Sequence, residues 1–202
     1  TILYVAIDKK YVGYVLIADK IKQDSPKTIR ELKAMNIKET VMLTGDKKEV
    51  GEYVAKKLNM DKVYTELLPD GKVEKVEELL KQKSEKGKLV FVGDGINDAP
   101  VLTISDIGVA MGGLGSDAAI EAADIVIMTD ETSKISKAIN LSKKTMRIVR
   151  ENIIFAIFVK IAVLVLTAFG ASTMWEAVFA DVGVSVIAII NALRMLNIKK
   201  FE

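Results

Sequence analysis

The sequence LVFVGDGINDAP at residues 89–100 places an apolar run directly before a turn that carries two carboxylates. The run Leu89–Val92 has the β-branched and aromatic composition of a buried strand. In open α/β sheets ligands bind outside the carboxyl ends of strands, so Asp94 and Asp98 stand where a ligand would bind. Carboxylate oxygens suit Mg²⁺, and Asn97 adds an amide donor for a phosphoryl oxygen. The alternative is a Gly-Asp turn that caps a helix, but capping requires neither glycine on both sides of Asp94 nor the second acid.

The chain around this turn alternates short apolar runs with charged helical stretches up to residue 150, which predicts α/β architecture. A strand pair is expected at Tyr4–Ile7 and Val12–Ala18, and Ser25 is expected to cap a helix that has Pro26 in its first turn. The candidate parallel strands are Val41–Leu43, Val63–Tyr64, Leu89–Val92, Ile107–Ala110 and Ile125–Met128. The candidate helices between and after them are Lys47–Leu58, Lys72–Lys83, Ser116–Ala123 and Ser133–Arg150.

A second strand end also suits an anion. The run Val41–Leu43 is followed by Thr44, Gly45 and Asp46 and then by a helix. A hydroxyl, a backbone without Cβ and the amides of a helix N-terminus therefore converge at one place. Taken alone, the same turn is also typical of an ordinary helix N-cap.

The composition excludes several classes of protein and several kinds of catalytic group. Half of the 202 residues are apolar and 28% are charged, which excludes a disordered or collagen-like chain. The net charge of +2 argues against a nucleic-acid partner. The chain contains neither Cys nor His, so carboxylates, lysines and backbone groups are left to do any chemistry.

The charges are unevenly distributed along the chain. Only four of the 29 basic and four of the 27 acidic side chains lie after residue 150. The segments 153–170 and 177–196 contain one and two charged residues, and each is long enough to cross about 30 Å of hydrocarbon as a helix. We therefore expect a transmembrane hairpin, so that the lipid bilayer is a partner; a buried helical hairpin is the alternative.

The flanking charges predict the orientation of this hairpin. Four basic residues precede the first span and three lie at the end of the second, whereas the connector Ala171–Trp175 carries no charge. By the positive-inside rule, residues 1–150 and the C-terminal tail are expected in the cytoplasm, with the plasma (inner) membrane as the expected location. Thr1 in place of Met, followed at once by a strand-like run, indicates a piece of a longer protein.

Two opposite charges lie inside the expected spans. Counting from Ser172 at the tip, Lys160 is 12 residues back and Asp181 is nine ahead, which places them at depths of about 18 and 14 Å. Charges inside a membrane are costly and are usually functional. We expect an ion pair in which Asp181 can exchange Lys160 for a divalent cation; a structural pair, or a lysine that extends to the membrane surface, is the alternative.

Together these motifs resemble the haloacid dehalogenase superfamily as it is found in P-type ATPases. Thr44-Gly45-Asp46, Lys72 in LLPDGKVEKV and GDGINDAP at 93–100 match in order and spacing, and residues 107–128 are similar to the segment after that last motif in cation pumps. Asn152 followed by Lys160, and then Asp181-Val182-Gly183, resembles the zinc-, cadmium- and lead-exporting branch. The resemblance implies a partial Rossmann-like phosphorylation domain at 1–150 and a transmembrane hairpin at 151–202.

The resemblance also implies roles for single residues. Asp94 and Asp98 would form the Mg²⁺ corner, and Asn97 would contact phosphate. Lys72 would neutralise the charge of the nucleophile and the phosphoryl group. Thr44 and Gly45 would bind phosphoryl oxygens and Asp46 would border the nucleotide site, so these three residues would be catalytic together with Lys72 and Asn97. The cofactor-binding set for ATP would consist of Thr44, Gly45, Asp46 and Gly95. Asp181 would hold the transported zinc, cadmium or lead ion, with Lys160 as its counter-charge.

The family's phosphorylated aspartate, in an Asp-Lys-Thr-Gly-Thr motif, is not present in this sequence. The nearest imitations begin at Asp8 and Asp19, and neither continues into Thr-Gly-Thr. The nucleotide domain, the actuator domain and the earlier membrane helices are expected in a missing N-terminal part of the same pump. We therefore expect the chain alone to be inactive. The alternatives are a membrane-anchored phosphatase of the haloacid dehalogenase type, or an inactive truncated remnant.

Overall fold

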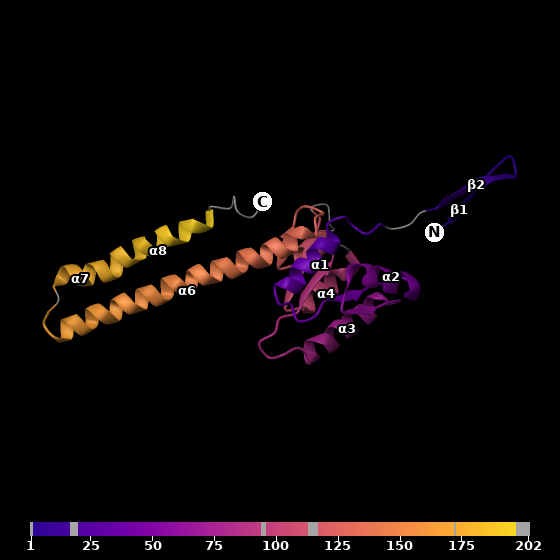
Figure 1. Cartoon of the computed structure of the whole chain (residues 1–202). Helices are drawn as coiled ribbons and strands as arrows, with labels where there is room; N and C mark the ends of the chain where they lie inside the picture. Colours follow the sequence, from indigo (N-terminus) through magenta and orange to yellow (C-terminus); the bar gives the residue numbers. More distant parts are fainter. Residues whose placement is uncertain (1, 17–19, 94–95, 113–116, 172, 197–202) are drawn as a thin grey trace. The chain divides into compact units, whose positions relative to one another are not determined.

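The computed structural model describes residues 2–16, 20–93, 96–112, 117–171 and 173–196 (Figure 1). It divides into two compact units, Thr1–Lys134 and Ile135–Glu202. The boundary between the units falls near the start of the long helix α6, Ser133–Ala168. The division into domains at residue 150 stays a prediction.

The chain begins with an antiparallel hairpin of β1, Ile2–Ile7, and β2, Lys10–Leu16. Asp8 and Lys9 form its two-residue turn with positive φ angles of 49° and 63°, as the tight turns of hairpins require. Tyr4 is 74% exposed, and its neighbours along both strands are also largely uncovered. A two-stranded hairpin with so much exposed apolar surface has little stability of its own.

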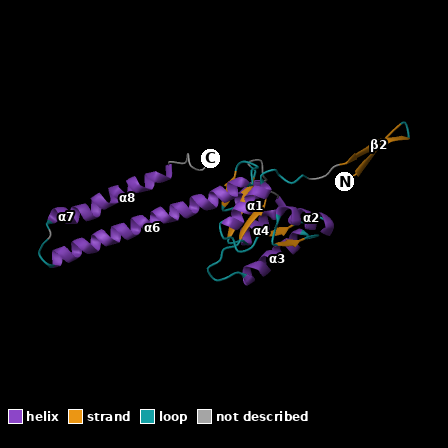
Figure 2. Cartoon of the chain, viewed as in Figure 1, coloured by secondary structure: helices purple, strands orange, loops and turns teal. Residues whose placement is uncertain are grey.

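Parallel strands form the centre of the first unit (Figure 2). β3, Val41–Leu43, pairs with β4, Lys62–Tyr64. A second sheet has the order β5-β6-β7 and comprises Val90–Gly93, Ile107–Met111 and Ile125–Ile127. Both sheets are parallel, so the expected α/β architecture is confirmed.

Helices connect these strands, as parallel pairing requires. They are α1, Ser25–Ala34; α2, Lys48–Leu58; α3, Pro69–Gln82; α4, Ala99–Ile104; and α5, Asp117–Ala122. The core lies where α3 and α4 meet the second sheet, with Val76, Val101 and Leu102 at most 1% exposed. A Cβ at Gly108 would lie 2.6 Å from the carbonyl oxygen of Leu102, so only glycine lets α4 pack this closely on β6.

Ser25 is not the N-cap that we expected for α1. The helix begins at Ser25, and Asp24 occupies the N-cap position without capping the helix through its side chain. The Asp24 carboxylate instead accepts a hydrogen bond of 2.9 Å from the backbone N–H of Ser133. This bond lowers the pKa of Asp24 below its ordinary value. Asp24 does not cap α1 because its carboxylate is bound by the backbone N–H of Ser133, which lies more than 100 positions away in the sequence.

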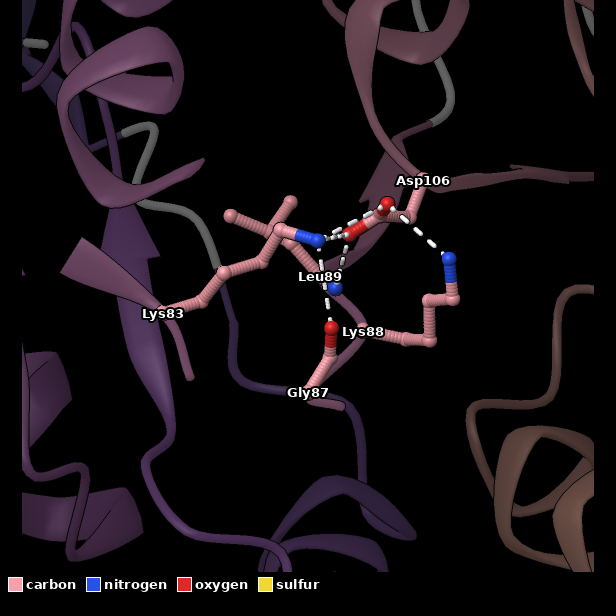
Figure 3. A network of polar contacts seen from close by, with 5 residues as sticks. All are labelled: Lys83, Gly87, Lys88, Leu89 and Asp106. Carbon is pink, nitrogen blue, oxygen red and sulfur yellow. Dashed lines mark hydrogen bonds and ion pairs between the residues drawn. The ribbon is translucent and has the colours of Figure 1, made fainter. Parts of the chain in front are cut away.

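A polar network joins the amino ends of β5 and β6 (Figure 3). Asp106 accepts hydrogen bonds from the backbone N–H of Leu89 at 2.8 Å and from the Lys83 ammonium at 3.0 Å, and Lys88 lies 3.4 Å away. The Leu89 hydrogen bond, followed by that of Lys83, lowers the pKa of Asp106 to about 2. The network connects β5 to β6 and so stabilises the sheet. It lies at the amino ends of these strands, whereas Gly93 lies at the carboxyl end of β5, so the network does not belong to the candidate site.

The second unit is a helical hairpin. α6 is continuous from Ser133 to Ala168, and the returning segment consists of α7, Met174–Val178; a π-helix, Phe179–Gly183; α8, Val184–Ala192; and a 3₁₀ turn, Leu193–Leu196. Among the described residues, both 133–168 and 174–196 are long and apolar enough to cross a membrane. Large apolar side chains such as Phe158, 69% exposed, cover the outside of the hairpin. Their exposure to water would be costly, whereas hydrocarbon accommodates them.

Candidate functional site

The Thr44–Asp46 turn follows β3 directly. The backbone N–H of Thr44 extends the pairing of the strand by donating to the carbonyl oxygen of Tyr64. The Thr44 hydroxyl donates to the Asp46 carboxylate at 2.8 Å and accepts from the Asp46 backbone N–H at 3.1 Å. The turn is therefore a closed local loop with an exposed acid at its tip.

The loop that leads into α3 holds this turn in place. The backbone N–H of Glu66 donates to the carbonyl oxygen of Asp46, and that of Leu67 donates to the carbonyl oxygen of Thr44. A Cβ at Gly45 would lie 3.3 Å from the carbonyl oxygen of Leu67, so the two backbones approach closely here. We did not identify Glu66 and Leu67 from the sequence, because they act through backbone groups that every residue has.

Lys72 and Asp98 form the charged centre of the candidate site. Lys72 lies in the first turn of α3, and its ammonium is 2.8 Å from the Asp98 carboxylate. The Lys72 and Asp98 side chains are only 20% and 12% exposed, so solvent screens this pair less than a surface pair. The contact joins two of the residues that the sequence predicts, although 26 positions separate them.

Asp98 takes its place because β5 ends in a glycine. It is the last residue of a 3₁₀ turn, Ile96–Asp98, that leads into α4. A Cβ at Gly93 would lie 2.9 Å from one Asp98 carboxylate oxygen and 2.9 Å from the Phe91 ring. The first glycine of the Gly-Asp-Gly motif therefore makes room for the second acid, a role that is not apparent from the sequence alone.

The predicted Mg²⁺ corner is described only in part. Asp94 and Gly95 lie outside the described residues, and Asn97 is exposed beside Asp98. No group of three or more Asp or Glu side chains arranged around a metal position occurs among the described residues. Asp98 nevertheless has the right chemistry, since it is a buried carboxylate held in one orientation by Lys72. The described residues therefore fit one side of a Mg²⁺ site, and the assignment to this site stays a prediction.

Asp8, one imitation of a phosphorylated aspartate, does not occupy such a corner. It lies in the turn of the β1–β2 hairpin, where the strands are antiparallel. A nucleophile of this fold would stand at the carboxyl end of a parallel strand. Asp19, the other imitation, lies outside the described residues.

Within the hairpin unit, the predicted ion pair is present. The Lys160 ammonium on α6 lies 3.0 Å from the Asp181 carboxylate. The two side chains are 60% and 75% exposed, so the hairpin by itself does not cover them. They border an open cleft that is otherwise lined by small and apolar residues: Val163, Leu164, Thr167, Ala168, Ala177 and Ala180.

Asp181 lies in the middle of the π-helix Phe179–Gly183. The Ser185 hydroxyl donates to the Asp181 carbonyl oxygen at 2.8 Å, which provides that carbonyl with a partner beside the wider turn. A Cβ at Gly183 would lie 2.5 Å from the Phe179 ring, so the ring packs directly over the glycine. The sequence did not predict this turn, although π-turns are frequent at functional sites.

The comparisons with known proteins agree with this architecture. Residues 2–103 match the model of the haloacid dehalogenase-like hydrolase family. The chain belongs to this family, as its parallel sheet and its strand-end motifs predict. Within the family, its resemblance to the heavy-metal-transporting P-type ATPases is confirmed by similarity to individual pumps.

The chain is 57% identical to the cadmium, zinc and cobalt-transporting ATPase of Bacillus subtilis (strain 168), over 98% of this chain and 28% of that protein. It is 53% identical to the zinc-transporting ATPase of Synechocystis sp. (strain ATCC 27184 / PCC 6803 / Kazusa), over 96% of this chain and 27% of that protein. The crystal structure of a zinc-transporting PIB-type ATPase in the E2.Pi state has a TM-score of 0.84 at 35% identity, covering 96% of this chain and 31% of that one. The chain thus spans little more than a quarter of the length of these curated relatives.

Proposed function

We propose that this chain is the C-terminal part of an ATP-driven pump that exports a divalent heavy-metal ion, namely zinc, cadmium or lead. The observation that carries the proposal is the Lys160–Asp181 ion pair, placed within a membrane-length hairpin of a haloacid dehalogenase-like chain. The phosphorylated aspartate, the nucleotide domain and the remaining membrane helices belong to the missing N-terminal part. The names of the relatives, which include cadmium, zinc and cobalt transport, support this class of cargo.

The site in the first unit serves phosphoryl transfer. Asp94 and Asp98 would hold Mg²⁺, which would supply positive charge beside ATP and the aspartyl phosphate. Lys72 adds a second positive charge, and its 2.8 Å contact with Asp98 fixes the position of that charge. Thr44 and Gly45 contribute a hydroxyl and a backbone N–H, and Asn97 contributes an amide, to phosphoryl oxygens. Asp46 and Gly95 border the nucleotide.

The exposed ion pair supports a pump with further membrane helices. Charged side chains within a membrane almost always face protein or a water-filled cavity. Because Lys160 and Asp181 are uncovered in the hairpin, another part of the protein must cover them in a bilayer. Asp181 then supplies an oxygen ligand for the metal, and Lys160 supplies the positive charge when the ion has left.

The hairpin also gives the proposed location. Basic residues flank both of its open ends, so residues 1–150 and the C-terminal tail lie in the cytoplasm and the spans cross the plasma (inner) membrane. On this arrangement the membrane domain begins at residue 151. The phosphorylation site then faces cytoplasmic ATP.

The test uses the longer protein that contains this chain. Asp181→Asn is expected to abolish zinc-stimulated ATP hydrolysis and to lower the amount of zinc bound per protein. The matched control is Glu176→Gln, which removes another carboxylate of the same span but keeps a side chain that can form the capping box with Thr173. Normal zinc stimulation in Asp181→Asn would refute the transport role and leave the pair as a structural bridge.

A further inference from the structure

A second polar cluster joins the two helices of the hairpin, away from the ion pair. The Arg194 guanidinium donates to the side-chain oxygen of Asn191 at 2.9 Å. The Asn191 amide donates to the side-chain oxygen of Asn152 at 2.8 Å, and the Asn152 amide donates to the carbonyl oxygen of Ala188 at 3.1 Å. These bonds form one continuous chain from Arg194 across to α6 and back to α8.

This cluster has a defined direction. Each amide accepts a hydrogen bond from the preceding residue and donates one to the next, so neither amide can be turned over without losing both. Arg194 also lies 3.4 Å from the Glu151 carboxylate, which ties it to the residue next to Asn152. Both asparagines are half-buried, and apolar residues follow Asn152 and precede Asn191 along the chain.

The distance between the cluster and the ion pair is similar on the two helices. On α6, Asn152 and Lys160 are eight residues apart, or about 12 Å. On the returning segment, Asp181 lies seven residues from Ala188 and ten from Asn191, or about 10 to 15 Å. If α6 slipped by one helical turn against the returning segment, Lys160 would move by about 5 Å relative to Asp181 along the helix axis. This shift would break their 3.0 Å contact.

We infer that Asn152 and Asn191 are positioning residues that set the register of α6 against the returning segment, and through it the contact between Lys160 and Asp181. The inference rests on the proposed function only for its consequence in transport. The register itself is a property of this chain. Apolar packing alone fixes register weakly in lipid, because side chain and solvent are equally apolar, whereas hydrogen bonds between helices specify it.

Leucine variants separate this role from simple packing. Asn152→Leu keeps a side chain of similar size and suits hydrocarbon, so a packing role predicts little change. A register role predicts a loss, because the leucine can neither accept from Asn191 nor donate to Ala188. Asn191→Leu breaks the same link from the other side, so the double variant should add little to either single one.

The register can be measured on the full chain in lipid nanodiscs. Because the sequence contains no Cys, spin labels attach only at introduced cysteines, for which we choose the exposed Met146 on α6 and Met174 on α7. Electron–electron double resonance should give one narrow distance distribution for the wild-type hairpin. Asn152→Leu and Asn191→Leu should each broaden it or shift it by about 5 Å. Asn140→Leu, the same change at an exposed position of α6, should leave it unchanged.

The results of these experiments distinguish the positioning role of the two asparagines from the proposed transport function. An unchanged distribution in both single variants overturns the positioning role, and far-ultraviolet circular dichroism shows whether each variant is helical. In the longer protein, Asn152→Leu should raise the zinc concentration for half-maximal ATPase activity up to about tenfold. If the distribution shifts while Asp181→Asn keeps full zinc stimulation, the register role stands and the proposed transport function fails.

Discussion

Replacing Asp106 by Asn tests the network that joins the amino ends of β5 and β6. Asn can still accept the hydrogen bond from the Leu89 backbone, but it removes the charge that faces Lys83 and Lys88. The Asp106 side chain is only 16% exposed, so this charge is among the better shielded of the first unit. We expect the variant to fold and to be less stable at neutral pH.

The size of the effect follows from the pKa of Asp106. A fall from 3.8 to about 2 corresponds to about 2 kcal/mol of free energy of unfolding. Solvent reaches Lys88, so screening lowers the expected contribution to about 1 kcal/mol. Since the folded pKa is lowered, the contribution is complete above the unfolded pKa of 3.8 and is lost as the pH falls through about 2.

The assay compares urea unfolding of the full chain in nanodiscs at pH 7 and near pH 2, followed by the loss of helical signal. The wild type should exceed Asp106→Asn by about 1 kcal/mol at pH 7, and most of this difference should be lost near pH 2, where the folded carboxyl group is about half protonated. Asp130→Asn is the matched control: Asp130 is also ion-paired, to Lys22, but is 69% exposed, so its loss should cost little. An equal difference between wild type and Asp106→Asn at both pH values would refute the linkage argument.

Three further predictions concern the candidate sites. Gly93→Ala should lower the free energy of unfolding by about 1 to 3 kcal/mol, because its Cβ would push Asp98 away from Lys72; unchanged stability in urea would contradict the close packing. Gly183→Ala should weaken zinc stimulation in the longer protein by displacing the Phe179 ring, and adding Phe179→Ala should restore part of it if this contact is the cause. Purified residues 1–202 should form no acid-stable phosphoenzyme from ATP, and detection of one would mean that a nucleophile lies within the chain.

Much of the first unit could be predicted from local patterns. Apolar runs such as Val41–Leu43 became parallel strands. α2, α3 and α5 begin and end within a few residues of the expected positions, whereas the short helix α4 between β5 and β6 was not among the expected helices. The Lys160–Asp181 pair was also predictable, because helix rise converts sequence position into depth.

The remaining features depend on contacts between distant residues. Asp24 does not cap α1 because Ser133, 109 residues away, takes its carboxylate. The network of Asp106 with Lys83 and Leu89 has no signature in the sequence, since isolated charges of this kind are usually solvated. The π-helix at Phe179–Gly183 lies within a run of residues that suits an ordinary α-helix equally well.

The π-helix Phe179–Gly183 holds one residue more in its turn than a regular α-helix would. Deleting Ala180 or Val182 would let this turn close into a regular α-helix and leave the residues on either side nearly in their present orientation. Asn191 would then still face Asn152, whereas a deletion in α8 before Asn191 would turn it by about 100° around the helix axis. A scan of single-residue deletions along the returning segment should therefore show tolerance of the hairpin register at the π-helix and loss of the polar cluster when the deletion falls in α8.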